Sequence, residues 1–222
     1  MNIHTIILAA GKGTRMNTNL PKVMQPLGGK TIISHVIDTA QKVSDHITLV
    51  TGYKKEVLKQ FIGASYPNVI SVDQDEQLGT GHAVKQASHL IAPNQKILIL
   101  YGDVPLIAEA TIQALISEPT DCCLLSMLPD DPTPYGKVIK DSSGHAIKIT
   151  EQKDASDEER KIPEVFTGIM TVNGEMLVTA LDEINNKNAA SEYYLTDLVE
   201  ILSSKGVKIN CIQANPDEVV GA

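Results

Sequence analysis

The stretch Ile3-His-Thr-Ile-Ile-Leu-Ala-Ala-Gly-Lys-Gly-Thr-Arg-Met16 decides the fold of this chain. It begins with an apolar, β-branched run and passes directly into a glycine-rich segment. Such a run is typical of a buried strand of a parallel sheet that ends in a loop. In α/β sheets, ligands bind beyond the carboxyl ends of the strands. The sequence therefore predicts a ligand-binding loop after the first strand.

The loop has the composition of a phosphate site. Gly11 and Gly13 permit positive φ angles and close approach, so consecutive backbone N–H groups can converge on phosphate oxygens. Lys12, Arg15 and Lys22 supply three of the 19 basic residues of a chain whose formal net charge is −8. The Walker spacing and the third glycine of the dinucleotide fingerprint are absent. The alternative interpretation is a structural turn with solvated charges.

Outward from this loop, apolar strands alternate with amphipathic helical stretches. This pattern predicts an α/β fold, a Rossmann-like, mostly parallel sheet with helices on both faces. After Leu128 the chain becomes turn-rich, and 137–140 with 145–150 predicts a hairpin of a smaller antiparallel lobe. Strands are expected at 3–8, 47–51, 69–72, 97–100 and 122–128, and helices at 32–43, 54–61, 83–90 and 111–117.

Composition restricts the class of protein. With 222 residues, 42% of them hydrophobic and 21% charged, the chain can form a globular core. The acidic balance argues against nucleic acid or an anionic membrane as partner, and no leader or spanning segment is found, so a cytoplasmic location is expected. Cys122, Cys123 and Cys211 lack metal-ligand spacing and are expected to be reduced, buried thiols. The sequence does not predict the oligomeric state.

Further blocks follow the loop at separated positions. They are Pro21-Lys22, Gln74-Asp-Glu-Gln-Leu-Gly-Thr-Gly-His-Ala83, Tyr101-Gly-Asp-Val-Pro-Leu106, Asp131-Pro-Thr-Pro-Tyr-Gly136, Glu151-Gln-Lys-Asp154, Thr167-Gly-Ile169 and Glu192-Tyr-Tyr-Leu-Thr-Asp197. In this order and spacing the blocks resemble the nucleotidyltransferases that make nucleotide sugars. More narrowly, they resemble the uridylyltransferase half of the bifunctional bacterial GlmU enzymes, which makes UDP-N-acetylglucosamine.

The resemblance implies the nucleotide-diphospho-sugar transferase fold over residues 1–222. Residues 1–128 would form the nucleotide-binding part and 129–222 the sugar-phosphate-facing part. The hexapeptide repeats of the acetyltransferase β-helix half are absent, so that activity is not expected here. The implied substrates are UTP and a sugar 1-phosphate, most readily N-acetylglucosamine 1-phosphate.

The resemblance also implies residue roles. Arg15 and Lys22 would act on the phosphates as catalytic groups, together with Asp103. The nucleotide would contact Leu8, Ala9, Ala10, Gly11, Lys12, Gly13, Lys22, Gln74, Gly79 and Thr80. The sugar phosphate would contact Tyr101, Gly102, Gly136, Glu151 and the position of Phe166.

Two of these roles also follow from residue chemistry. Asp103 comes directly after a predicted buried strand, and a single carboxylate is adequate for a Mg²⁺ ion that also binds phosphates and water. Gln74 can donate and accept hydrogen bonds at once, which suits the imide edge of uracil. The hydroxyl of Thr80 is expected to cap the next helix.

The chain departs from the family pattern at two places. Phe166 stands where the family has an Asn that contacts the sugar, and it offers no hydrogen-bonding group. In the family an Asn two residues after Glu-Val-x-Gly shares Mg²⁺ with the Asp, whereas Glu218-Val-Val-Gly221 is followed only by Ala222. Either a longer protein supplies this ligand, or the metal binds through Asp103, phosphates and water.

Three alternatives remain open at this stage. The chain could be a sister nucleotidyltransferase that uses another sugar phosphate or another triphosphate. It could be a catalytically degenerate protein that binds nucleotide sugars. It could also be an ordinary α/β protein whose glycine loop is structural.

Overall fold

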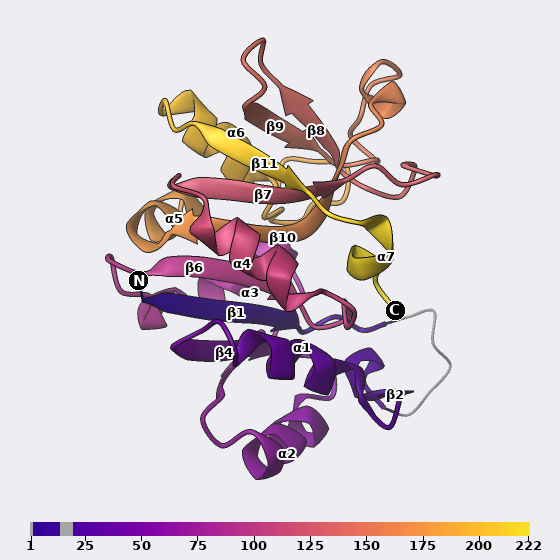
Figure 1. Cartoon of the computed structure of the whole chain (residues 1–222), viewed down its shortest axis with the longest axis vertical. Helices are drawn as coiled ribbons and strands as arrows, with labels where there is room; N and C mark the ends of the chain where they lie inside the picture. Colours follow the sequence, from indigo (N-terminus) through magenta and orange to yellow (C-terminus); the bar gives the residue numbers. More distant parts are fainter. Residues whose placement is uncertain (1, 14–19) are drawn as a thin grey trace.

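The computed structural model describes residues 2–13 and 20–222 as a mixed α/β fold around one large sheet (Figure 1). The strands are β1 Ile3–Ala9, β2 Pro26–Leu27, β3 Lys30–Thr31, β4 His46–Thr51, β5 Ile70–Asp73, β6 Lys96–Tyr101, β7 Cys122–Met127, β8 Lys137–Lys140, β9 Ala146–Thr150, β10 Val165–Asn173 and β11 Ile209–Gln213. The α-helices are α1 Ile32–Ala40, α2 Lys55–Ser65, α3 Thr80–Gln86, α4 Glu109–Ser117, α5 Gly174–Leu181, α6 Asp197–Ser204 and α7 Pro216–Val219. Among these described residues, no helix is both long enough and apolar enough to cross a bilayer.

The main sheet has the strand order β11-β7-β10-β6-β1-β4-β5, and the hairpin of β8 and β9 attaches to β10. Neighbouring strands on this path are parallel except for β10, which runs antiparallel to both β6 and β7. The predicted mostly parallel α/β sheet is confirmed, as is the hairpin after Leu128.

β1 is an interior strand, between β6 and β4, and both of its faces are covered. Ile7 packs into one apolar core with residues of α1, α2 and α4, whereas Ile6 packs into a second core with residues of α3, α5 and α6. Both side chains are fully buried. Burial of one such side chain contributes roughly 1.5–3 kcal/mol. A strand buried on both faces shows a continuous apolar run, which is why the first strand is evident in the sequence.

β10 was not expected as a strand, although it lies between β6 and β7. Its sequence contains Gly168 at φ +90°, and its register shifts between Phe166 and Met170. A glycine inside an apolar run resembles a turn signal, but here it marks an irregularity within a strand. The strands β1, β5 and β6 nevertheless end near one another, and these ends carry the predicted motifs.

Candidate active site

A cavity of about 370 Å³ lies at the edge of the sheet where β1 and β6 end and where the chain leaves β5. Its wall is formed by Leu8, Ala9, Ala10, Gly11, Gly13, Lys22, Val23, Gln74, Gln77, Gly79, Thr80, Ala83, Tyr101, Asp103 and Glu192. A larger hollow of about 850 Å³ around Lys96 and Lys208 contains none of the residues predicted from the motifs. The cavity at the strand ends is therefore the candidate active site.

The loop after β1 forms one wall of this cavity. Gly13 has a φ of +54°, and a Cβ added there would lie 2.8 Å from Cβ of Lys22. Both the backbone and the packing therefore require glycine at this position. Lys12 is exposed and is not among the lining residues. Arg15 lies outside the residues that the structure describes.

Lys22 and Asp103, two of the predicted catalytic residues, meet at the cavity although they are 81 positions apart. Lys22 begins the short 3₁₀ helix Lys22–Met24, and Asp103 follows β6. The Nζ of Lys22 donates to Oδ2 of Asp103 at 2.6 Å, and the two side chains are 26% and 28% exposed. The site thus pairs a cation with a carboxylate at its open edge.

The carboxylate of Asp103 is chemically suited to Mg²⁺. This ion prefers oxygen ligands, and it commonly combines one or two carboxylates with substrate phosphates and water. Asp103 lies on the cavity wall and keeps enough exposure for water and phosphate to approach. In the described part of the chain, no group of three or more His, Cys, Asp or Glu side chains could hold a metal. A Mg²⁺ ion at Asp103 would therefore need further ligands such as phosphate oxygens and water.

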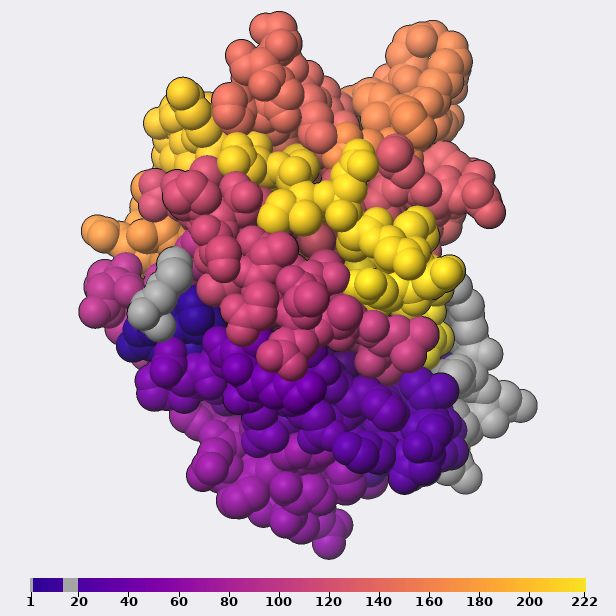
Figure 2. Space-filling model, in the orientation of Figure 1, coloured from indigo at the N-terminus to yellow at the C-terminus, as the bar shows by residue number. Residues whose placement is uncertain are grey.

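The C-terminal segment packs against the loop of Asp103. The backbone N–H of Ala222 donates to the carbonyl oxygen of Asp103 at 2.8 Å. α7 is attached to α4 because the hydroxyl of Thr111 donates to Oε2 of Glu218 at 2.6 Å. Figure 2 shows the yellow C-terminal segment beside the α4 region on this face. The last residues of the chain therefore lie next to the predicted metal ligand.

Gln74 lies at the inner end of the cavity and is only 3% exposed. Its Nε2 donates to the carbonyl oxygen of Gly79 at 3.0 Å and lies 3.0 Å from Nδ1 of His82. Its backbone carbonyl accepts from the amide of Gln77 at 3.0 Å. The carbonyl oxygen of Gly79 therefore takes one amide hydrogen, and Nδ1 of His82 can take the second when its ring is protonated on Nε2.

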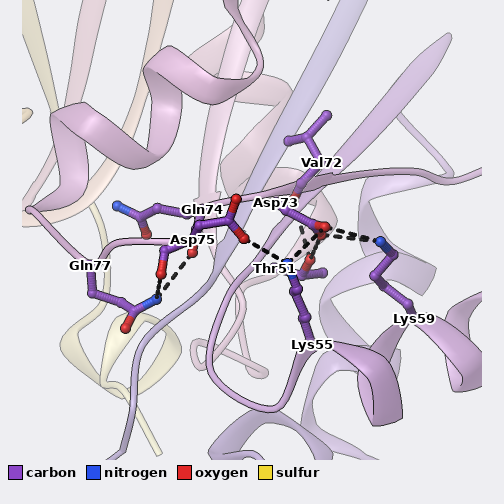
Figure 3. A network of polar contacts seen from close by, with 8 residues as sticks. All are labelled: Thr51, Lys55, Lys59, Val72, Asp73, Gln74, Asp75 and Gln77. Atoms are coloured by element: carbon purple, nitrogen blue, oxygen red, sulfur yellow. Dashed lines mark hydrogen bonds and ion pairs between the residues drawn. The ribbon is translucent and has the colours of Figure 1, made fainter.

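A polar network anchors the strand end that carries Gln74 (Figure 3). Asp73 accepts from the hydroxyl of Thr51 at 2.9 Å and forms ion pairs with Lys55 and Lys59, each at 3.1 Å. Burial is the largest single effect on the pKa of Asp73 and raises it, but the hydrogen bonds from Thr51, Lys55 and Lys59 outweigh burial and lower this pKa. The network fixes the backbone that positions Gln74.

The turn before α3 requires Gly79. Its φ is +117°, and a Cβ there would lie 2.5 Å from the carbonyl oxygen of Tyr193. The same oxygen accepts from the N–H of Gly81 at 2.8 Å. The expected cap by Thr80 is wrong, because Gly79 is the N-cap and Thr80 is the first helical residue. The hydroxyl of Thr80 instead accepts from the N–H of Leu195 at 3.0 Å.

Two of the residues predicted for the sugar side, Tyr101 and Glu151, line two different cavities. Tyr101 lines the 370 Å³ cavity, and burial is the main effect that raises its pKa. Glu151 lines a neighbouring cavity of about 430 Å³, where Oε1 accepts from the hydroxyl of Thr196 at 2.9 Å. Burial also raises the pKa of Glu151. A Cβ added at Gly136 would lie 3.6 Å from Oε2 of Glu151, so these two predicted residues are neighbours.

Phe166 and Gly102 are placed in the core. The side chain of Phe166 is 6% exposed and packs in the apolar cluster below β10, while its N–H donates to the carbonyl oxygen of Gly136 at 2.9 Å. Gly102 is buried, and its N–H donates to the carbonyl oxygen of Leu8 at 2.9 Å. Neither residue is among those that line the 370 Å³ cavity.

The cavity also contains residues that were not predicted. These are Val23, Gln77, Ala83 and Glu192. Each lies inside or directly beside a block that the sequence analysis had quoted. Their position in or beside these blocks could have identified them as cavity residues, whereas their side-chain chemistry could not.

Comparison with known proteins agrees with the motifs. The MobA-like NTP transferase domain matches residues 5–139. The bifunctional protein GlmU of Cellvibrio japonicus (strain Ueda107) is 47% identical over 211 residues, which cover 94% of this chain and 46% of the relative. GlmU of Burkholderia orbicola (strain AU 1054) is 45% identical over 221 residues, with 98% and 48% covered. The chain thus spans about half the length of these relatives.

Solved structures show the same fold. A UDP-glucose pyrophosphorylase complexed with UDP-glucose aligns with a TM-score of 0.81 at 19% identity, covering 96% of this chain and 90% of that one. The inositol-1-phosphate CTP transferase from T. maritima aligns with a TM-score of 0.76 at 16% identity, covering 95% and 84%. The expected nucleotide-diphospho-sugar transferase fold is confirmed, as is the resemblance to GlmU. The chain belongs to the MobA-like NTP transferase domain family, the nucleotidyltransferases to which its motifs also point.

Proposed function

We propose that this chain transfers UMP from UTP to a sugar 1-phosphate, with N-acetylglucosamine 1-phosphate as the first candidate, in a Mg²⁺-dependent reaction. The observation that carries the proposal is the meeting of the glycine loop, Lys22, Gln74 and Asp103 around one cavity. The relationship to GlmU supports it.

The reaction needs no nucleophile from the protein. An oxygen of the sugar phosphate forms a bond to the α-phosphorus of the triphosphate, and the bond from that phosphorus to the bridging oxygen breaks as pyrophosphate leaves. Catalysis then depends on positioning and on stabilising charge. Backbone N–H groups from Ala10 to Gly13 would bind the phosphates, and Lys22 would contact the α-phosphate. Arg15 would neutralise the leaving pyrophosphate.

The ion pair of Lys22 and Asp103 suggests how the site prepares for substrate. An incoming phosphate competes with Asp103 for Nζ of Lys22, because both are anions. Asp103 is then the carboxylate that would hold Mg²⁺, which when bound neutralises phosphate charge. The pair therefore keeps both groups at the cavity before substrates arrive.

The sugar end rests on Glu151 and Gly136, which lie beside each other. The carboxylate of Glu151 can accept hydrogen bonds from sugar hydroxyls, and Thr196 fixes one of its oxygens. Phe166 supplies no polar group. The side chain of Phe166 is buried in the core, so a sugar group that needs a polar partner from this position would stay unpaired at a cost of roughly 1–3 kcal/mol. Another sugar 1-phosphate is therefore a second candidate acceptor.

The test is pyrophosphate release with UTP, Mg²⁺ and a panel of sugar 1-phosphates. Release that depends on one sugar phosphate supports the proposal and identifies the acceptor. No release with any sugar, together with nucleotide binding by calorimetry, would instead support a binding protein. The same panel with CTP and dTTP tests the choice of base.

A further inference from the structure

We infer that His82 is a positioning residue that sets nucleobase selectivity by fixing the orientation of the Gln74 amide. This inference rests on the proposed function, because it concerns how that site distinguishes uridine from cytidine nucleotides.

The amide of Gln74 has only one group left for a ligand. Its nitrogen carries two hydrogens, and the two acceptors within reach are the carbonyl oxygen of Gly79 and Nδ1 of His82, each at 3.0 Å. Gln74 is nearly fully buried, so these contacts are not replaced by water. In this orientation the side chain offers Oε1, an acceptor, to the cavity that it lines.

The polarity of this acceptor distinguishes the pyrimidines. The edge of uracil presents an N–H donor at N3 between two carbonyl oxygens, which matches an acceptor. Cytosine presents a ring nitrogen with a lone pair at the same position, so two acceptors would face each other. If the Gln74 amide turned by 180°, its N–H₂ would suit cytosine instead.

His82 prevents this turn because of how its ring is held. Nε2 of His82 lies 3.1 Å from Nε2 of Gln86, and the ring lies 6.3 Å from the ring of Tyr193. A neutral imidazole carries one proton, so only one of the two glutamine amides can donate to it. Each amide nitrogen also donates to a backbone carbonyl, that of Gly79 for Gln74 and that of His82 for Gln86 at 3.1 Å. Gln74 is buried, so turning its amide would place Oε1 against the carbonyl oxygen of Gly79 with no water to separate them. Gln86 is half-buried on α3, so water can replace its contact when its oxygen turns toward the ring. The proton is therefore on Nε2, and Nδ1 accepts from Gln74.

The experiment compares His82→Leu with His82→Asn. Leucine removes the acceptor, whereas Oδ1 of asparagine lies close to the position of Nδ1 and can accept from Gln74. We measure kcat and KM with UTP and with CTP, and the affinities of UDP and CDP by calorimetry. For His82→Leu we expect the preference for uridine nucleotides to fall about tenfold, mainly through KM, and His82→Asn should restore it.

The outcomes separate the two proposals. An unchanged uridine preference in an active His82→Leu variant overturns the role of His82 and leaves the proposed function standing. A wild-type protein that does not prefer uridine nucleotides overturns both. A second measurement needs no variant: the ¹⁵N chemical shifts of the His82 ring should show an unprotonated Nδ1 and a protonated Nε2. A protonated Nδ1 would contradict the inference even if His82→Leu failed to fold.

Discussion

Lys22 donates a 2.6 Å hydrogen bond to Asp103, which joins the loop after the first strand to the end of β6. The two residues belong to separate sequence blocks, and their pairing places both at the mouth of the candidate active site. An ion pair with this degree of exposure contributes about 0–1 kcal/mol to stability. Its importance is therefore expected to lie in the reaction.

Replacing the carboxylate of Asp103 separates its effect on the reaction from its effect on stability. Asp103→Asn should reduce Mg²⁺-dependent pyrophosphate release by at least about a hundredfold, because the residue that is both the proposed metal ligand and the partner of Lys22 loses its charge. The unfolding free energy in urea should change by less than about 1 kcal/mol. Asp38→Asn is the control, since Asp38 forms a comparable pair with Lys30 at 2.5 Å and is not among the residues that line the cavity. Near-normal activity of Asp103→Asn would show that the metal assignment is wrong.

Gly79→Ala tests the turn before α3. The new Cβ would lie 2.5 Å from the carbonyl oxygen of Tyr193 at a φ of +117°, so both packing and backbone oppose it. We expect a loss of about 3 kcal/mol or more of stability and weaker binding of UTP. Gly144→Ala is the matched control, because Gly144 has a φ of +85° with open space around it. It should cost only about 1–2 kcal/mol. Equal losses in the two variants would contradict the clash.

The pKa of Asp197 predicts a pH dependence of stability. This pKa is raised to about 6, mainly by burial, and the negative charges of Glu200 and Glu151 contribute to the rise. The native state therefore keeps a proton that the unfolded state has lost, and this group's contribution to the unfolding free energy falls as pH rises from about 4 to about 6. Asp197→Asn should remove this fall in the unfolding free energy, because asparagine does not titrate.

The measurement is urea unfolding of both proteins at pH 4 and pH 8. The variant should match the wild type at pH 4 and exceed it by about 1 kcal/mol at pH 8, a value reduced for partial exposure of the group. Glu200→Gln, on the exposed side of the same helix, should have a smaller effect. A variant that is less stable at pH 8 would show that the carboxylate has a stabilising partner.

The cysteines should be chemically silent in the native protein. Cys122 and Cys123 are buried as expected, whereas Cys211 is only partly buried. Burial raises the pKa of Cys123 to about 12 and that of Cys211 to about 11. Little thiolate is then present at neutral pH. Titration with Ellman's reagent should find no rapidly reacting Cys122 or Cys123 until guanidinium unfolds the chain. Rapid labelling of either residue would indicate local opening of β7.

The sequence predicted the parts of the fold that have local signals. The first strand, the glycine loop and the alternation of strands and helices up to Met127 were evident because continuous apolar runs and helical periodicity depend on nearby residues. The cavity wall was predicted through blocks at 8–22, 74–80 and 101–103. β10 could not be predicted in the same way, because Gly168 interrupts its pattern and its partners, β6 and β7, lie far away in the sequence.

The hydrogen bonds that orient the side chain of Gln74 also could not be predicted from the sequence. The amide nitrogen of Gln74 lies 3.0 Å from both the carbonyl oxygen of Gly79 and Nδ1 of His82, and the sequence predicted neither contact. Such an arrangement depends on a turn that brings three side-chain and backbone groups together within a few ångströms. Sequence spacing limits which groups can meet, but it does not determine how their hydrogen bonds are divided.

The insertion of β10 has a consequence for how the chain folds during synthesis. The strand that completes the sheet between β6 and β7 lies near residue 170, so a ribosome must release most of the protein before the central sheet can close. Until then, β6 keeps an unpaired edge that can join another chain. Fragments that end before Val165 should therefore aggregate rather than fold, and residues 1–128 are not expected to be separable by truncation.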